Sequence, residues 1–165
     1  MGWARVLRHL AASPAMTRRH FSVAVRGRIE AAIREAESRH AGEICFAIET
    51  ALPWRELLHA VTPRQRALEV FARLRVWDTH ANNGVLIYVL WADRAVEIIA
   101  DRGISQRVTQ PEWDAVCRQV EAQYAARRFA EGSITAVGAV AALLARHFPS
   151  AVNDADELPN QPILL

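Results

Sequence analysis

Residues 75–103, RVWDTHANNGVLIYVLWADRAVEIIADRG, decide the fold of this chain. A polar loop leads into the apolar run Val85–Trp91, and a charged turn separates this run from a second one, Val96–Ala100. The two runs predict the strands of a tight hairpin. Neither run alternates between apolar and polar residues, so we expect helices to cover both faces of the sheet.

The rest of the chain predicts one further strand and a set of helices. The run ICFAI at residues 44–48 predicts a short buried strand. A helical crossover from this strand to the hairpin makes the first two strands parallel. We therefore predict an α/β fold with a small mixed sheet of three to four strands sandwiched between helices. Capping signals and apolar periodicity predict four helices in the first half of the chain, near residues 2–12, 23–40, 53–60 and 62–77. Two more are predicted in the second half. One begins at residue 109 and ends at a break marked by Phe129 and Gly132, and the last covers 133–147.

The length of 165 residues fits a single domain with an extension at each end. We expect residues 1–21 to form a basic N-terminal arm, 22–149 the α/β domain, and 150–165 an extended, proline-containing tail. The longest apolar run, Ile134–Ala145, is shorter than the ~20 residues of a membrane-spanning helix. Arginines interrupt the N-terminal apolar stretch, unlike in a secretory signal. These features predict a cytoplasmic protein, peripheral to a membrane, with no signal peptide or transmembrane helix.

The chain has twenty arginines and no lysine, and the arginines are unevenly distributed. The formal net charge is +2, yet residues 1–28 hold six arginines and no acid. The absence of lysine agrees with a GC-rich genome or with phosphate recognition by guanidinium groups, and the spread of the arginines favours the genome. Acids alternate with arginines outside the arm and no recognition motif is present, so we expect no nucleic-acid partner.

The N-terminal arm can form a short amphipathic helix. Trp3, Val6, Leu7 and Leu10 would share one face of it, with the arginines elsewhere. A helix of this kind can rest weakly on an anionic membrane surface. It can equally dock onto its own domain, and docking would use the same apolar face.

Polar residues gather where the predicted strands begin and end. The start of the second strand at Asn83 and the end of the third at Asp101 share one edge of the sheet with Asp78 and His80 of the preceding loop. Oxygen ligands suit calcium or magnesium, so Asp78, Asn83 and Asp101 are the candidate metal ligands. The alternative is that these residues cap and turn the backbone, with Asp101 in a surface ion pair with Arg102.

The sequence predicts no catalytic residue. It contains no HExxH, CxxC, GxxxxGK[ST] or GxSxG motif, and no order of Ser, His and Asp that selects a triad. Cys45 lies in a predicted strand and Cys117 on the apolar face of a predicted helix, where both are expected to act as small buried hydrophobes.

The hairpin and the residues beyond it resemble the signature of the TPM domain family. That family includes a thylakoid-lumen phosphatase, a photosystem II repair protein and a modulator of acetylcholine receptors. The resemblance covers about residues 25–148 and implies a small sheet sandwiched by helices. Within the family, the chain resembles a short bacterial subgroup. The elements that carry it are Asn83-Gly84-Val85-Leu86-Ile87, Asp93-Arg94, Val96-Glu97-Ile98, Asp101-Arg102-Gly103-Ile104 and the later Arg128-Phe129-Ala130-Glu131-Gly132, which resembles a Phe-x-x-Gly element.

The resemblance implies two functions. Acid phosphatase activity and calcium binding belong to some members, and relatives often lie beside LemA-type membrane proteins. An acidic residue that many relatives carry soon after a Gly-x-Gly that follows the third strand is missing from Gly103–Val108. We therefore expect a non-enzymatic binding or accessory module near a membrane, whose partner is a LemA-type or other membrane-associated protein. The alternative is a calcium- or magnesium-dependent acid phosphatase that uses the edge formed by Asp78, Asn83 and Asp101.

Overall fold

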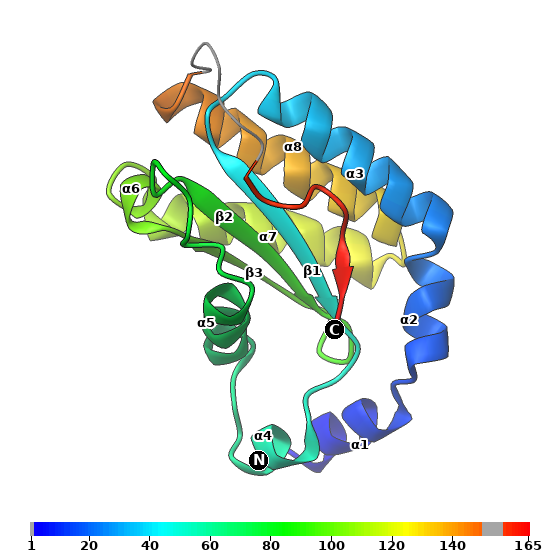
Figure 1. The fold of residues 1–165 in the computed structure, drawn as a ribbon. Helices are drawn as coiled ribbons and strands as arrows, with labels where there is room; N and C mark the ends of the chain where they lie inside the picture. The colour runs from blue at the N-terminus through cyan, green and yellow to red at the C-terminus, as the bar shows by residue number, and fades with distance from the viewer. Residues whose placement is uncertain (1, 150–156) are drawn as a thin grey trace.

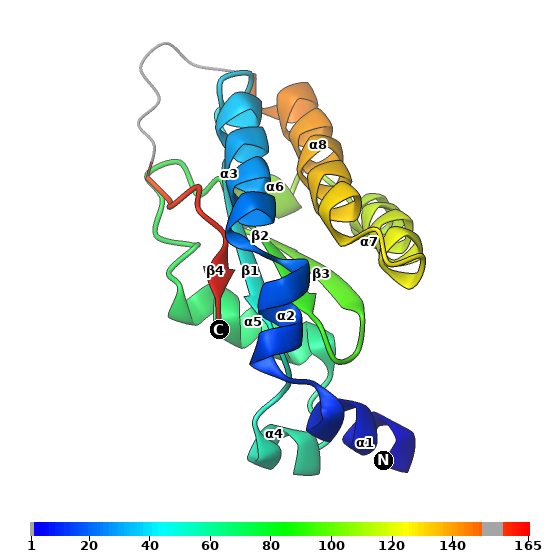
Figure 2. The same cartoon turned by 90° about the vertical axis from the view of Figure 1, so that its right-hand side faces the viewer.

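A computed structural model describes residues 2–149 and 157–165 of the chain. A four-stranded sheet lies between two helical layers (Figures 1 and 2). The strand order is β3-β2-β1-β4, in which β1 is parallel to β2 and β4 and antiparallel pairing joins β2 to β3. The predicted α/β class and mixed sheet are confirmed. The strands are β1 Glu43–Glu49, β2 Gly84–Leu90, β3 Ala95–Ala100 and β4 Ile163–Leu164.

Long helices cover both faces of the sheet, and short helices lie at its two ends (Figures 1 and 2). One face packs against α3 (Val23–Glu37), α7 (Gln110–Ala125) and α8 (Phe129–His147), and the other against α5 (Pro63–Arg73). The predicted capping boxes at Thr62 and Thr109 open α5 and α7. The short helices are α1 Trp3–Ala11, α2 Pro14–His20, α4 Trp54–Leu58 and α6 Arg102–Ser105.

The lack of alternation in the strands follows from burial on both faces. Every residue of β1 and β2 is buried. Successive side chains of a strand point to opposite faces. Accordingly Phe46 and Ile87 belong to the core beneath α3, α7 and α8, while Leu86 and Tyr88 belong to the core beneath α5. Both cores need apolar side chains, so the strands read as continuous apolar runs.

The start of the last helix differs from the prediction. The break lies at Arg127, which has a positive φ of 59°, and Phe129–Gly132 form the first turn of α8 rather than a loop. Gly132 stands there because α7 and α8 approach closely. A Cβ at this position would lie 2.8 Å from Cε1 of Tyr124. The glycine therefore marks a helix contact and not a helix break.

The two predicted extensions both contain regular structure. Within the arm, Ser13 accepts a hydrogen bond from the Met16 N–H and Pro14 opens α2, a helix that the sequence analysis missed. Within the tail, residues 163–164 add to the sheet as β4, with Ala47 paired to Ile163. Residues 150–156 of the predicted tail lie outside the described residues. The predicted boundaries at 21/22 and 149/150 stay predictions.

Candidate functional site

The amino ends of the parallel strands hold two of the three predicted metal ligands. The Asp101 N–H donates to the Gly84 carbonyl at 2.9 Å, which places Asn83 and Asp101 at neighbouring positions of this edge. Asp78 makes a different interaction: its carboxylate is 57% exposed and lies 3.9 Å from the guanidinium of Arg75. The structure therefore joins Asn83 with Asp101 and gives Asp78 a separate partner.

Asn83 and Asp101 each keep one buried oxygen without a hydrogen bond. The Asn83 amide donates to the Ala41 carbonyl, and Oδ1 of Asp101 accepts the Arg102 N–H at 2.7 Å, which caps α6. Oδ1 of Asn83 and Oδ2 of Asp101 have no partner within the described ranges. Two oxygens are fewer than the six or more that calcium takes, so carbonyls and water would have to complete a site. No group of three or more His, Cys, Asp or Glu suited to a metal occurs among the described residues.

Several signature residues at this edge have structural roles. A Cβ at Gly84 would lie 1.9 Å from the Val76 carbonyl oxygen, and one at Gly103 would lie 2.5 Å from that of Asn82. The guanidinium of Arg102 donates to Oδ1 of Asn82 at 3.0 Å, and not to Asp101 as the alternative interpretation supposed. His80, which the sequence placed beside these ligands, is exposed, and its backbone N–H donates to Glu157 at 3.0 Å. The loop before β2 is thus held against the strands by close backbone contact.

The opposite edge of the sheet anchors α1 through Asp93, in the turn between β2 and β3. Arg5 donates to Oδ2 of Asp93 from Nε at 2.9 Å and from Nη2 at 2.8 Å. Arg8 lies 3.3 Å and Nε2 of His9 lies 3.1 Å from Oδ1. Nδ1 of His9 accepts the Leu52 N–H at 3.0 Å, so the imidazole proton sits on Nε2, where it can donate to Asp93. The turn residue of the hairpin is therefore the main polar anchor of the arm.

The helix α1 docks through a face that the sequence analysis did not select. Arg5, Val6 and His9 turn inward, and Val6 is the one member of the predicted apolar face that is buried. The other three members point to solvent. The fully formed guanidinium–carboxylate contact fixes which side faces the domain, so the apolar face is left uncovered. The exposed side chains are Trp3 at 81%, Leu7 at 63% and Leu10 at 68%.

A second short helix carries further exposed apolar side chains at this end of the molecule. The helices α1 and α4 lie at the same end of the molecule in both views (Figures 1 and 2). Trp54 and Leu58 of α4 are 60% and 47% exposed. The only acid of α4, Glu56, faces inward, where Oε1 lies 2.7 Å from Nη1 of Arg66. We call the set Trp3, Leu7, Leu10, Trp54 and Leu58 the apolar end of the molecule.

The Asp93 anchor makes the docking of α1 acid-sensitive. Burial raises the pKa of Asp93, but the hydrogen bonds from Arg5 and His9, together with the charge of Arg5, outweigh burial and hold this pKa below its usual value. A carboxyl group whose pKa is lowered on folding adds stability above its unfolded pKa of about 3.9, and this stability is lost as the pH falls through the folded pKa. We expect α1 to stay docked at neutral pH and to detach progressively as the pH falls below the unfolded pKa of about 3.9 and through the folded one, with faster amide exchange in residues 3–11.

The variant Asp93→Asn should release α1 at neutral pH, because it removes the charge that faces two guanidinium groups. The expected loss is about 2 kcal/mol of local protection, the range of hydrogen bonds to charged groups. Arg18→Ala, at an exposed position of α2, serves as the control and should leave exchange in α1 unchanged. Equal exchange rates for Asp93→Asn and the control would contradict the anchor.

A buried ion network, which the sequence did not predict, lies at the carboxyl end of β1. Glu49 accepts hydrogen bonds from Nε and Nη2 of Arg66 at 2.9 and 2.7 Å and from the Tyr88 hydroxyl at 2.6 Å. The hydrogen bond to Glu49 raises the pKa of Arg66, and burial together with the same carboxylate raises that of Tyr88. Both donors therefore stay protonated and engaged. The signal in the sequence is the glutamate that follows the apolar run Ile44–Ile48 at the carboxyl end of the strand.

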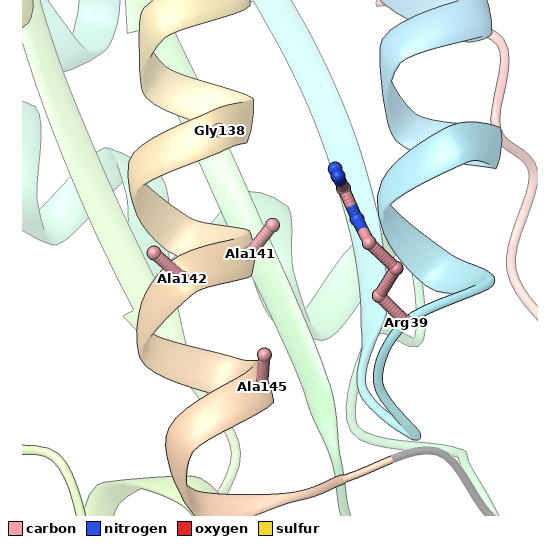
Figure 3. A pocket seen from close by; sticks show the side chains of 5 residues that line it. All are labelled: Arg39, Gly138, Ala141, Ala142 and Ala145. Atoms are coloured by element: carbon pink, nitrogen blue, oxygen red, sulfur yellow. The ribbon is translucent and has the colours of Figure 1, made fainter.

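A shallow groove between α3 and α8 has little chemistry to offer. It has a volume of about 240 Å³ and is lined by Arg39 and by small residues of α8. Figure 3 shows the Arg39 side chain beside α8, with the methyl group of Ala141 directed toward it and that of Ala142 directed away. Arg39 is already 3.7 Å from Glu35. The groove holds no further charged or hydrogen-bonding side chain from the described residues, so we assign it no function.

The helix α8 is long and apolar enough, by length and composition, to cross a membrane. Half of the relevant window is buried inside the domain, and no other helix among the described residues passes the same test. The buried side includes Val137, Val140 and Leu144, which pack in the core. We therefore interpret α8 as a core helix.

Comparisons with known proteins agree on the family. A family model described as the TPM domain matches residues 17–143. The structure is similar to the solution structure of the BA42 protein from the psychrophilic bacterium Bizionia argentinensis, with 31% identity, a TM-score of 0.76, and coverage of 87% of this chain and 94% of that one. No curated protein matches the chain.

A more distant structure shows the same fold. The N-terminal domain of a protein from P. gingivalis has 19% identity and a TM-score of 0.62, over 79% of this chain and 82% of that one. The family match spans most of the chain and includes the hairpin and its signature residues, from Asn83 to Gly103. Together with the BA42 likeness, it shows that this chain belongs to the TPM domain family.

Proposed function

We propose that this TPM domain is a non-enzymatic accessory module that binds reversibly to the cytoplasmic surface of an anionic membrane. The apolar end carries the proposal. Its side chains stand on two helices that are already docked through other contacts, so they are not needed for the stability of the domain. Contiguous exposed apolar patches mark sites of interaction with proteins or membranes.

The charge around the apolar end favours a membrane with anionic lipids. Arg55 is exposed on α4, and Glu56 is directed away toward Arg66. Arg8 is exposed on α1 and shares the single negative charge of Asp93 with Arg5, so this site keeps a net positive charge. Each basic residue near an anionic surface adds about 1 kcal/mol of attraction. Tryptophan side chains such as Trp3 and Trp54 are favoured at the level of the headgroups. The two contributions together support weak, salt-sensitive binding rather than permanent insertion.

Sedimentation with vesicles tests this proposal. The protein should sediment with vesicles that contain phosphatidylserine, less with pure phosphatidylcholine, and less again at high salt. Trp3→Ser should weaken binding to the anionic vesicles about tenfold, because it removes one large side chain from the interface. Trp77→Ser removes a tryptophan that is 49% exposed at the opposite edge of the sheet and should have no effect.

Two results would contradict the proposal. The first is a full-length protein that ignores anionic vesicles at low salt. The second is equal binding by Trp3→Ser and Trp77→Ser. At the membrane we expect a membrane-associated protein as partner, of the LemA type that the family resemblance implies.

A second function, metal-dependent phosphatase activity, draws support from one observation. Oδ1 of Asn83 and Oδ2 of Asp101 are buried acceptors without hydrogen bonds, as the ligands of an absent hard cation would be. A metal ion there could activate water and stabilise a developing phosphoryl charge. The carboxylate of Asp78, at 57% exposure beside Arg75, would have to move to join them.

Metal addition tests this second function. If the edge binds calcium or magnesium, millimolar metal should raise the melting temperature of the protein, because a ligand that binds only the folded state stabilises it. Asp101→Asn keeps an oxygen for the α6 cap but removes the negative charge. This variant should abolish the rise in melting temperature that metal causes. A melting temperature that is indifferent to metal and chelator, with no hydrolysis of p-nitrophenyl phosphate, would exclude this function.

A further inference from the structure

A cavity with an aromatic wall and a cationic rim lies at the carboxyl end of β2. It has a volume of about 110 Å³ and is lined by Met16, His20, Trp91, Arg94, Arg127 and Phe129. A neighbouring cavity of about 210 Å³ shares Met16, Trp91 and Arg94 with the first. The carboxyl ends of the strands are where open α/β sheets place their ligands. From this cavity and its charged rim we propose a binding site for a small organic anion in which a flat ring carries a phosphate or carboxylate group.

The wall of this cavity is a packed cluster of rings. The ring centroid of Trp91 lies 4.8 Å from that of His20 and 4.4 Å from that of Phe129. The centroids of His20 and Phe129 are 4.7 Å apart. The His20 and Trp91 planes are stacked, with an angle of 29° between them. Three rings fixed against one another present a preformed apolar surface. Such a surface favours stacking of a further flat ring.

The rim carries positive charge that the protein leaves uncompensated. The side chains of Arg94 and Arg127 are exposed, and no carboxylate in the described part of the chain lies within ion-pair distance of either one. The nearby acids have other partners: Asp93 pairs with Arg5, and Glu131 of the first turn of α8 lies 3.9 Å from Arg28. Guanidinium groups bind phosphate and carboxylate groups with paired hydrogen bonds. An anionic group therefore suits this rim.

His20 acts as part of the apolar wall and not as a third cation. Burial, with the nearby charges of Arg19 and Arg127, lowers the pKa of His20 below its usual value. The imidazole is then neutral at neutral pH, and its ring can stack with Trp91. Both rim arginines also share a backbone feature: Arg94 and Arg127 have a positive φ, of 53° and 59°. This conformation is uncommon for arginine and is tolerated best by asparagine and glycine.

The size of the two cavities limits the ligand. Sites for drug-sized molecules usually have volumes of about 300–1,000 Å³. Both cavities are smaller, at about 110 and 210 Å³, so a single ring with one anionic group fits better than a larger molecule. This ligand site goes beyond the proposed membrane contact, which uses the outer faces of α1 and α4 and neither Arg94 nor Arg127. The larger cavity also touches α1 through Arg8.

Three small probes separate the ring from the charge. Phenylphosphonate carries both, methylphosphonate only the anion, and benzyl alcohol only the ring. None of these can be hydrolysed by a phosphatase. Titration of the full-length protein, followed by amide and indole chemical shifts, should show phenylphosphonate bound more tightly than either other probe. The shifts should centre on Trp91, Arg94 and Arg127.

Substitutions at the rim complete the test. Arg94→Asn and Arg127→Asn keep a residue that tolerates the positive φ, and each should weaken phenylphosphonate binding about tenfold, as expected for the loss of a charged hydrogen bond. Neither should change the weak binding of benzyl alcohol. Arg118→Gln is the control and should bind phenylphosphonate as the native protein does. Arg118 is exposed on α7 and has no carboxylate partner among residues 2–149 and 157–165.

Several outcomes would overturn the site. These are no saturable shift with phenylphosphonate, shifts centred away from Trp91, equal affinity for phenylphosphonate and methylphosphonate, or unchanged affinity in both asparagine variants. A native-like amide spectrum of each variant shows that it is folded. Equal affinity for phenylphosphonate and benzyl alcohol would also exclude a role for the arginines.

Discussion

Replacing Glu49 with alanine is expected to destabilise the protein by about 3–5 kcal/mol. Glu49 is buried and accepts three hydrogen bonds, two from Arg66 and one from the hydroxyl of Tyr88. Its loss leaves a buried guanidinium and a buried hydroxyl short of an acceptor, and both pay the cost of desolvation without compensation. Urea denaturation, analysed as a two-state transition, measures the change.

Glu69→Ala is the matched control for this prediction. Glu69 also contacts Arg66, at 3.0 Å, but its carboxylate is 55% exposed. Exposed ion pairs contribute about 0–1 kcal/mol, so this variant should be nearly as stable as the native protein. If Glu49→Ala and Glu69→Ala were equally stable, the buried network would not hold β1 to α5 as we describe.

The second large effect is expected for Gly84→Ala, which should lower the free energy of unfolding by about 3 kcal/mol or more. A Cβ at Gly84 would lie 1.9 Å from the carbonyl oxygen of Val76 and 3.0 Å from its carbonyl carbon. The contact is with backbone and not with a movable side chain, so β2 or the preceding loop would have to shift. The φ of Gly84 is not positive, so the close approach alone requires the glycine.

Gly27→Ala tests whether this cost is specific to the contact. Gly27 lies inside α3, where a Cβ would meet nothing within 4 Å. Alanine there should stabilise the protein by about 0.5–1 kcal/mol, because glycine is a poor helix former. Destabilisation of similar size in the two variants would mean that Gly84 is required for a reason other than the approach of Val76.

The hairpin and the sheet could be predicted because their signals are local. The two apolar runs and the charged turn Asp93-Arg94 define β2 and β3 by themselves. Burial on both faces follows from the missing alternation. The crossover then places Asn83 and Asp101 on one edge and Asp93 on the other, as the structure has them. The capping boxes at Thr62 and Thr109 are also local, and both are formed.

The features that the sequence analysis missed depend on distant partners. The docking face of α1 is set by Asp93 and by the Leu52 N–H, which bind Arg5 and His9 from far along the chain. Periodicity alone selects the apolar face, and it selects the wrong side for docking. The role of Gly132 depends in the same way on Tyr124 of the adjacent helix, which no helix-breaking rule includes.

For the candidate sites, too, the features that depend on local signals could be predicted and those that depend on distant partners could not. Asn83 and Asp101 could be placed together from topology, because both lie at strand ends. The cavity near Trp91 could not, since it needs Met16 and His20 from α2, a helix that the sequence did not predict, together with Phe129 from the revised start of α8. Unpaired charge at Arg94 and Arg127 is visible only when the partners of all neighbouring acids are known.

Hydrogen exchange with and without anionic vesicles tests the membrane proposal most directly, because it shows which surface is covered. We predict that phosphatidylserine vesicles slow amide exchange in residues 2–12 and 53–60, the two segments that carry the apolar end, and leave the loop 78–83 unchanged. High salt should reverse this protection. Unchanged exchange in both segments under conditions where the protein sediments with vesicles, or protection confined to 78–83, would contradict the account.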